Sequence, residues 1–368
     1  MTLIFIVILV ALVFEYINGF HDTANSIATV VSTKVLTPRQ AVVLAAITNL
    51  LGALWGTAVA KTISSGLVDA KLVSMTSDII ICALLAAIAW NLLTWWFGLP
   101  SSSSHALIGG LCGSALAASG NRWHVIIWAQ PDPKHWWLGK GLLWKVIVPM
   151  VTSPLAGFLL GFVFMALLYL LLQNARPTKV NRFFGVAQMF SAGAMGVMHG
   201  TNDAQKTMGI ISLTLLAATR AGQLQNLPEW LSFLRMAEPP PGKDPGIAVW
   251  IKVVCALTMA AGTAVGGWRI IKTLGHKMVK LHPINGFAAE ASSATVIAAA
   301  SSLGVPVSTT HNISAAIMGV GAARRINAIK WVVVERMVWA WILTIPVTAG
   351  LAYALVRCFR ALGFISPL

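Results

Sequence analysis

Two short motifs, each built around an aspartate, occur once in each half of the chain. The sequences GFHDTANSI and GTNDAQKTM place Asp22 and Asp203 at equivalent positions. The third residue after each aspartate is polar, Asn25 in one copy and Lys206 in the other. One such aspartate alone is typical of a helix cap. Because an ionised carboxylate costs about 2.5–3.5 kcal/mol at the centre of a membrane helix, the matched pair instead predicts a buried binding or coupling site.

Two hydroxyl-rich clusters also recur, PSSSSH at residues 100–105 and PVSTTH at residues 306–311. Each follows a proline and precedes an apolar stretch, which is where helix-capping side chains belong. A helix that begins inside a membrane also presents free backbone N–H groups and the positive end of its dipole, which attract anions. Two such helix starts, together with Lys206, would enclose a compact oxyanion, and phosphate suits this set of donors.

A histidine closes each hydroxyl cluster, and one glutamate lies in a separate apolar run. His105 and His311 are candidates for anion donors or proton carriers, with a purely structural role as the alternative. Glu290, within residues 284–303, has no acidic counterpart in the first half. We interpret it as a cation-coupling carboxylate, against the alternative of a paired structural acid. Glu15, which precedes the first aspartate motif, is a weaker candidate.

The charges of these candidates predict a mechanism. Asp22, Asp203 and Glu290 would carry three negative charges when ionised. Lys206 supplies one positive charge, so an entering anion would be repelled unless cations bind with it. Protons or sodium ions on the carboxylates would remove that repulsion, and the anion and cation would then load together. This linkage between two sites is symport.

The elements that carry these residues are membrane helices. The chain of 368 residues is 57% hydrophobic and 10% charged, whereas soluble domains carry about 25% charged residues. Several apolar stretches reach the roughly 20 residues that span a bilayer. The net charge of +15 comes mainly from loops, as the positive-inside rule describes. No soluble basic module indicates nucleic-acid binding, and no cofactor is predicted.

The repeated motifs divide the chain into two homologous halves. We expect an N-terminal transmembrane repeat at 1–172, a short basic central loop at 173–182 and a C-terminal repeat at 183–368. An all-α fold with about 10–12 membrane segments is predicted, including broken helices and re-entrant helical hairpins. The first helix is expected to break at Asn18 and Gly19, and Asp203 is likewise expected to lie beside a helix break. A midplane site between halves favours inverted repeats.

At these motifs the chain resembles the inorganic phosphate transporter (PiT) family. The segments GFHDTANSIATVV and HGTNDAQK are similar to its two signature motifs, and GLPSSSSHALIGG and GVPVSTTH to its hairpin motifs. The resemblance covers nearly the whole chain and is nearest to bacterial low-affinity phosphate transporters. It implies a homodimer of inverted-repeat subunits in the inner membrane. It also implies cation coupling through Asp22, Asp203 and Glu290, and phosphate contacts from Asn25, Ser103, Ser104, Lys206, Thr309 and Thr310.

The same resemblance predicts phosphate import by cation symport and alternating access. Sodium-coupled animal relatives have a glutamate near Asn49, so the asparagine favours protons, with sodium at Asp22 and Asp203 as the alternative. Proton-coupled relatives suggest that the cargo includes neutral metal–phosphate complexes.

Other functions stay open at this stage. The fold would also suit a transporter of another oxyanion, such as sulfate or arsenate, or a passive anion channel. An intramembrane hydrolase would need one activated nucleophile with an oriented base. Equivalent polar clusters in both halves argue against it.

Overall fold

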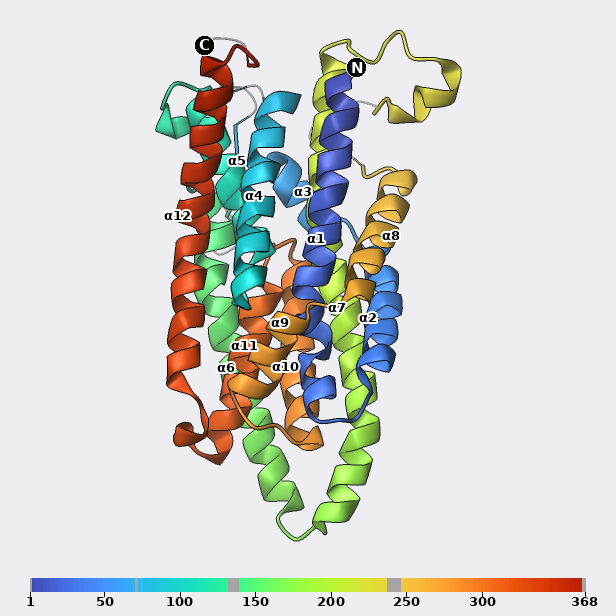
Figure 1. The fold of residues 1–368 in the computed structure, drawn as a ribbon, viewed down its shortest axis with the longest axis vertical. Helices are drawn as coiled ribbons and strands as arrows, with labels where there is room; N and C mark the ends of the chain where they lie inside the picture. The colour runs from blue at the N-terminus through green and yellow to red at the C-terminus, as the bar shows by residue number, and fades with distance from the viewer. Residues whose placement is uncertain (1, 70–71, 74, 132–138, 237–245, 366–368) are drawn as a thin grey trace.

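The computed structural model of the protein describes residues 2–69, 72–73, 75–131, 139–236 and 246–365. These residues form an elongated bundle of helices (Figure 1), and β-structure among them is limited to isolated bridges. The predicted all-α class is therefore confirmed. The first half contains α1 (Thr2–Ser32), α2 (Pro38–Ala53), α3 (Ala58–Ser65), α4 (Ser77–Phe97), α5 (Ser103–Ala118) and α6 (Val148–Leu172). The second half contains α7 (Pro177–Arg220), α8 (Val249–Val265), α9 (Trp268–Lys272), α10 (Pro283–Ser302), α11 (Thr309–Arg324) and α12 (Trp331–Ala361).

Apolar length identifies the fold as a multi-pass membrane bundle. In the described part of the chain, α1, α4, the segment Leu143–Leu172 and α12 are long and apolar enough to cross a membrane. The pair Val249–Val265 and Trp268–Lys277 passes the same test together, with a bend of 58° between its helices. The remaining helices are shorter or more polar. The predicted 10–12 segments include broken and re-entrant ones, so that number stays a prediction.

The two halves pack through each other rather than side by side. Both chain ends lie at one end of the bundle, and the connection from α6 to α7 lies at the other (Figure 1). Helix α1 runs away from the chain ends, whereas α7 runs back toward them (Figure 1). The α5 helix of the first half packs on α12 of the second, and α11 of the second packs on α6 of the first.

Two predicted helix breaks are wrong. Helix α1 continues through Asn18 and Gly19 without interruption. A Cβ at Gly19 would lie 2.5 Å from the carbonyl oxygen of Met259 and 3.1 Å from the Cα of Gly262. The glycine therefore permits a close helix crossing with α8 rather than a break. Helix α7 likewise runs unbroken past Asp203.

Other boundaries also differ from the sequence-based expectation. The apolar residues 39–60, long enough for one span, form parts of two helices, because Gly56 between α2 and α3 adopts a left-handed φ of 84°. Gly52 lies close to the backbone of Val197 in α7. The central loop is confined to residues 173–176, since α7 already begins at Pro177.

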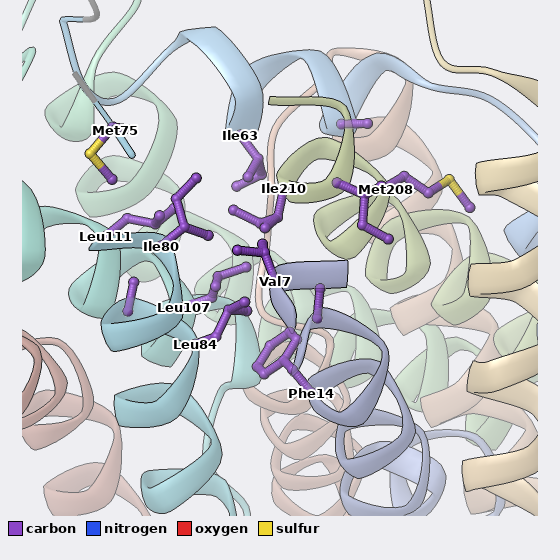
Figure 2. Packing of buried hydrophobic residues seen from close by; sticks show 14 of the residues in the cluster. Val7, Phe14, Ile63, Met75, Ile80, Leu84, Leu107, Leu111, Met208 and Ile210 are labelled. Carbon is purple, nitrogen blue, oxygen red and sulfur yellow. The ribbon is translucent and has the colours of Figure 1, made fainter. Parts of the chain in front are cut away.

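An apolar cluster fills the bundle on the side of the chain ends. Val7 and Phe14 of α1 meet Leu84 of α4, Leu107 of α5 and Ile210 of α7 (Figure 2). All five side chains are buried. They separate the polar residues in the middle of the bundle from that end of the molecule.

Candidate functional site

The centre of the site is an ion pair on α7. Lys206 Nζ lies 2.8 Å from Asp203 Oδ1, and both side chains are fully buried. Their i,i+3 spacing places them on one face of the helix. One turn earlier, His199 Nε2 lies 3.4 Å from the other oxygen of Asp203. A lysine and a histidine thus face the same carboxylate.

The second aspartate lies on α1 and is held by its neighbour. His21 Nδ1 lies 2.7 Å from Asp22 Oδ1. The other ring nitrogen, His21 Nε2, lies 3.1 Å from the hydroxyl of Thr94 on α4. The Thr94 and Ser101 hydroxyl oxygens are 2.8 Å apart. These contacts fix Asp22 relative to the start of α5.

The first turn of α11 joins the two aspartates. The Asn25 amide on α1 donates to the hydroxyls of Thr309 at 3.1 Å and Thr310 at 2.9 Å. Thr310 donates to Asp22 Oδ1 at 3.3 Å, and Thr309 donates to Asp203 Oδ2 at 3.4 Å. The structure therefore brings Asn25, Thr309 and Thr310 together with both aspartates, as the repeated motifs predict.

The two hydroxyl clusters begin helices in the same way. Ser102 Oγ accepts from the backbone N–H of His105, and Ser308 Oγ accepts from that of His311, both at 3.2 Å. Capping by the clusters is thus confirmed. Ser104 donates to the backbone carbonyl of Val307 at 3.4 Å, so the start of α5 meets the segment that leads into α11. The neighbouring Ser103 hydroxyl is buried and has no hydrogen-bond partner.

The two histidines face each other instead of the aspartates. The ring centroids of His105 and His311 are 4.9 Å apart in an edge-to-face arrangement. His311 also stacks on Trp341 of α12, with centroids 4.2 Å apart. Both rings are buried, and none of their nitrogens has a hydrogen-bond partner. Their predicted roles as anion donors or proton carriers stay predictions.

Glu290 belongs to a different polar cluster. It lies on α10, fully buried, and accepts hydrogen bonds from the hydroxyls of Thr29 and Ser191. The amide of Gln188 donates to it at 3.3 Å. Glu290 is thus not a ligand of the Asp22–Asp203 cluster, and Thr29 of α1 is its link to that cluster.

Comparison with known proteins decides the family. The model described as "Phosphate transporter family" matches residues 18–352 of the chain. The chain belongs to the phosphate transporter family. It is 42% identical over 346 residues to the probable low-affinity inorganic phosphate transporter of Bacillus subtilis (strain 168), covering 94% of each chain. It is 43% identical over 343 residues to the protein of the same description from Rhizobium meliloti (strain 1021), covering 93% of this chain and 92% of the relative.

A solved structure has the same fold. The chain matches "The sodium-dependent phosphate transporter" with a TM-score of 0.78 over 98% of this chain and 100% of that one. At 23% identity this likeness concerns the fold alone.

The phosphate transporter family and these relatives are transporters, not enzymes, so the hydrolase alternative is wrong. The geometry agrees with this outcome. In the described residues neither ring nitrogen of His105 accepts from a serine hydroxyl. The arrangement therefore lacks the nucleophile–base hydrogen bond of a hydrolase.

The site of this phosphate transporter family member contains two histidines that the sequence analysis missed. Ligand atoms of Asp22, His199 and Asp203 all lie within 4.8 Å of one another, as a cation site requires. His199 precedes Asp203 by four residues, a spacing that marks one helix face. His21 stands directly before Asp22. The sequence indicates Asn49 only through its bearing on the coupling ion. In the structure its Oδ1 lies 3.1 Å from His199 Nδ1, so Asn49 also contacts the site.

Proposed function

We propose that the protein imports inorganic phosphate by cation symport through alternating access. The observation that carries this proposal is the buried Lys206–Asp203 pair, which lies beside Asp22 at the start of α11. A buried array of one lysine, amide and hydroxyl donors and a helix N-terminus suits a tetrahedral oxyanion. Membership of the phosphate transporter family gives phosphate as the anion.

Phosphate binding would replace contacts that the site residues make with one another. Lys206 is held by Asp203, and the Asn25 amide is held by the two threonines. In the loaded state these donors would turn to phosphate oxygens, together with Ser103 and Ser104 of the opposite hairpin. The unpartnered Ser103 hydroxyl supports this role.

Cation coupling follows from the charges at the centre. Asp22 and Asp203 outnumber Lys206, so an added phosphate anion requires a cation. The Asp22–His199–Asp203 group is the candidate place for it. We favour protons because position 49 is a neutral asparagine rather than a glutamate, the residue of sodium-coupled animal relatives. Asn49 donates to Thr263 at 3.1 Å and holds His199 beside Asp203. Sodium is the rival cation, and the name of the structural neighbour, a sodium-dependent transporter, supports testing it.

We propose inverted repeats as the device for alternating access. The opposite directions of α1 and α7, and the exchange of α5 and α11 onto α12 and α6, support this proposal (Figure 1). The basic residues Arg176, Lys179 and Arg182 near the α6–α7 connection favour a cytoplasmic location for that end. An inner-membrane homodimer and transport of metal–phosphate complexes are further parts of the proposal.

The decisive experiment is uptake of radiolabelled phosphate into proteoliposomes of the purified protein, with proton and sodium gradients imposed separately. Accumulation driven by a proton gradient alone is expected. A sodium requirement would turn the carboxylates into sodium ligands, and no accumulation under either gradient would contradict symport. Competition by sulfate tests whether that anion is the substrate instead of phosphate. Weak competition is expected, because sulfate has no proton to donate to Asp22 or Asp203 at neutral pH.

A further inference from the structure

A continuous polar stripe follows one face of α1. Glu15, Asn18, Asp22, Asn25 and Thr29 are spaced alternately by three and four residues, which keeps them on one side of the helix. All five side chains are buried. The middle of the stripe forms the central site, and Thr29 at one end binds Glu290. The other end of the stripe, at Glu15, has no role in the function proposed above.

Glu15 has one satisfied oxygen and one unsatisfied oxygen. The hydroxyl of Thr207 on α7 donates to Oε2, whereas Oε1 is buried without a hydrogen-bond partner. Asn18 follows Glu15 by three residues on the same face of α1, and its amide oxygen and nitrogen are also buried without a hydrogen-bond partner. One oxygen of the carboxyl and both polar atoms of the Asn18 amide are therefore unsatisfied.

Glu15 also has no cationic partner. Among the described residues, no lysine, arginine or histidine nitrogen lies within ion-pair distance of it. The charged groups that bear on it are Asp203 and Lys206 of α7, and the titratable Cys255 thiol lies on α8. Lys206 is already paired with Asp203 at 2.8 Å. A buried carboxylate left without a partner is strongly disfavoured, so this group needs a proton or a bound cation.

A proton fits the geometry better than a metal ion. A proton on Oε1 would make that oxygen a donor, and the unsatisfied Asn18 amide oxygen, one turn along the same helix face, is a suitable acceptor. One proton would thus satisfy two unpartnered oxygens. A metal ion would need several further oxygen ligands, and the Oε2 side of the carboxyl is occupied by Thr207.

The position of Glu15 on α1 suits a proton donor to the central site. Glu15 precedes Asp22 by seven residues and Thr29 follows it by seven, about 10 Å along the helix in each direction. Carboxyl groups therefore flank the central site on both sides, Glu15 toward the chain ends and Glu290 toward the α6–α7 connection. Directly beyond Glu15, Phe14 begins the apolar cluster of Figure 2.

We infer that Glu15, with Asn18 as its hydrogen-bond acceptor, is a separate proton-binding station between the apolar cluster and the central site. It rests on the proposed function, whose coupling protons it would supply. The protonated Glu15 gives its proton to the carboxylate of Asp22 or Asp203, which then becomes a carboxylic acid. The Glu15 carboxylate then takes a new proton when the cluster opens toward the chain-end side.

Infrared spectroscopy tests the protonation itself. The C=O stretch of a protonated carboxyl is expected in the wild-type protein at neutral pH and is expected to be missing in Glu15→Gln. The chain has only 11 acidic residues, so the loss of one band is resolvable. The matched control is Glu335→Gln, which changes an exposed glutamate on α12 and should leave the band in place. Identical spectra for wild type and Glu15→Gln would overturn the inference.

Transport tests the relay. In proteoliposomes, Glu15→Gln should lower proton-driven phosphate uptake by about 5- to 150-fold, the usual size of coupling between two sites, and should flatten its pH profile. Exchange of phosphate for phosphate without a gradient should persist. An unchanged pH profile with full uptake would contradict the relay. Loss of sodium-driven uptake alone would make Glu15 a metal-ion site and overturn the proton assignment.

Two further comparisons keep the outcomes separate. If the wild type accumulates no phosphate under any gradient, the proposed function fails, while the infrared band still decides the state of Glu15. If Glu15→Gln does not fold, Asn18→Leu removes the acceptor and keeps the carboxyl. It should shift the band and lower proton-driven uptake, and an unshifted band with normal uptake would again overturn the inference.

Discussion

The side-chain nitrogen of Asn25 lies 2.9 Å from the hydroxyl oxygen of Thr310, although 285 positions separate the two residues. The contact ties α1 of the first half to α11 of the second. Because Thr310 also donates to Asp22, one threonine hydroxyl connects an amide and a carboxylate of the other half. The site is therefore complete only when both halves are docked, and movement of α11 relative to α1 would take it apart.

Replacing Asn25 by alanine should weaken phosphate binding and leave the fold intact. A hydrogen bond to a charged group contributes about 1.5–3 kcal/mol, so the KM for uptake should rise roughly 10- to 150-fold. Asn181→Ala, which changes an exposed asparagine on α7, is the control. An unchanged KM in Asn25→Ala would remove Asn25 from the binding site.

Replacing Lys206 by alanine should abolish uptake and destabilise the protein. Removing one partner of a buried ion pair costs about 3–5 kcal/mol because Asp203 is left without its cation. Thermal unfolding in detergent measures this loss. The double variant Lys206→Ala with Asp203→Asn should recover stability without recovering uptake. Recovery of uptake in the double variant would show that Lys206 only neutralises Asp203 and does not bind the anion.

Asn49 should act through His199 rather than by touching the cargo. Asn49→Leu removes the hydrogen bonds to His199 and to Thr263, each contributing about 0.5–1.5 kcal/mol. We expect lower uptake and a changed pH profile, because His199 is no longer held against Asp203. Of these two hydrogen bonds, Thr263→Val removes only the one between Asn49 and Thr263 and keeps the one to His199, so it should cause a smaller change. Equal effects of the two substitutions would indicate a packing role.

The close crossing of α1 and α8 predicts that adding even one methyl group at the crossing destabilises the protein. A Cβ at Gly262 would lie 2.1 Å from the carbonyl oxygen of Tyr16, so Gly262→Ala should cost about 1–3 kcal/mol by overpacking. Gly350→Ala is the matched control, because nothing lies within 4 Å of a Cβ there. That control should stabilise α12 by roughly 0.5–1 kcal/mol. Similar unfolding temperatures for both variants would contradict the crossing.

The repeated motifs predict several of the residues that meet at the centre. Asp22, Asn25 and Lys206 were predicted from their equivalent places, and the hydroxyl clusters were predicted as helix starts. The helix breaks were predicted wrongly because a glycine inside an apolar helix has two uses. Gly19 lowers helix propensity, but it also permits contact with Gly262, and only tertiary packing decides between these effects.

Other parts of the site were not accessible from spacing alone. His199 has the correct i,i+4 spacing from Asp203, yet its role depends on Asn49 of α2, which approaches from another part of the chain. The separation of Glu290 from the aspartates depends on where α10 packs, and no local pattern encodes that. The pairing of His105 with His311 likewise arises where the first turns of α5 and α11 meet.

Replacing the two aspartates should affect the stability of the protein differently, although both aspartates are needed for coupling. Asp22→Asn and Asp203→Asn should each abolish gradient-driven uptake, because each removes a carboxylate that balances the entering cation. Asp203→Asn also leaves Lys206 charged and buried, at a cost of about 3–5 kcal/mol. Asp22 contacts His21 rather than a lysine, so Asp22→Asn should cost much less. Asp78→Asn, in the first turn of α4, serves as the control for uptake and for unfolding temperature. Normal accumulation by either variant would remove that aspartate from the coupling mechanism, and equal unfolding temperatures would contradict the assignment of Lys206 to Asp203.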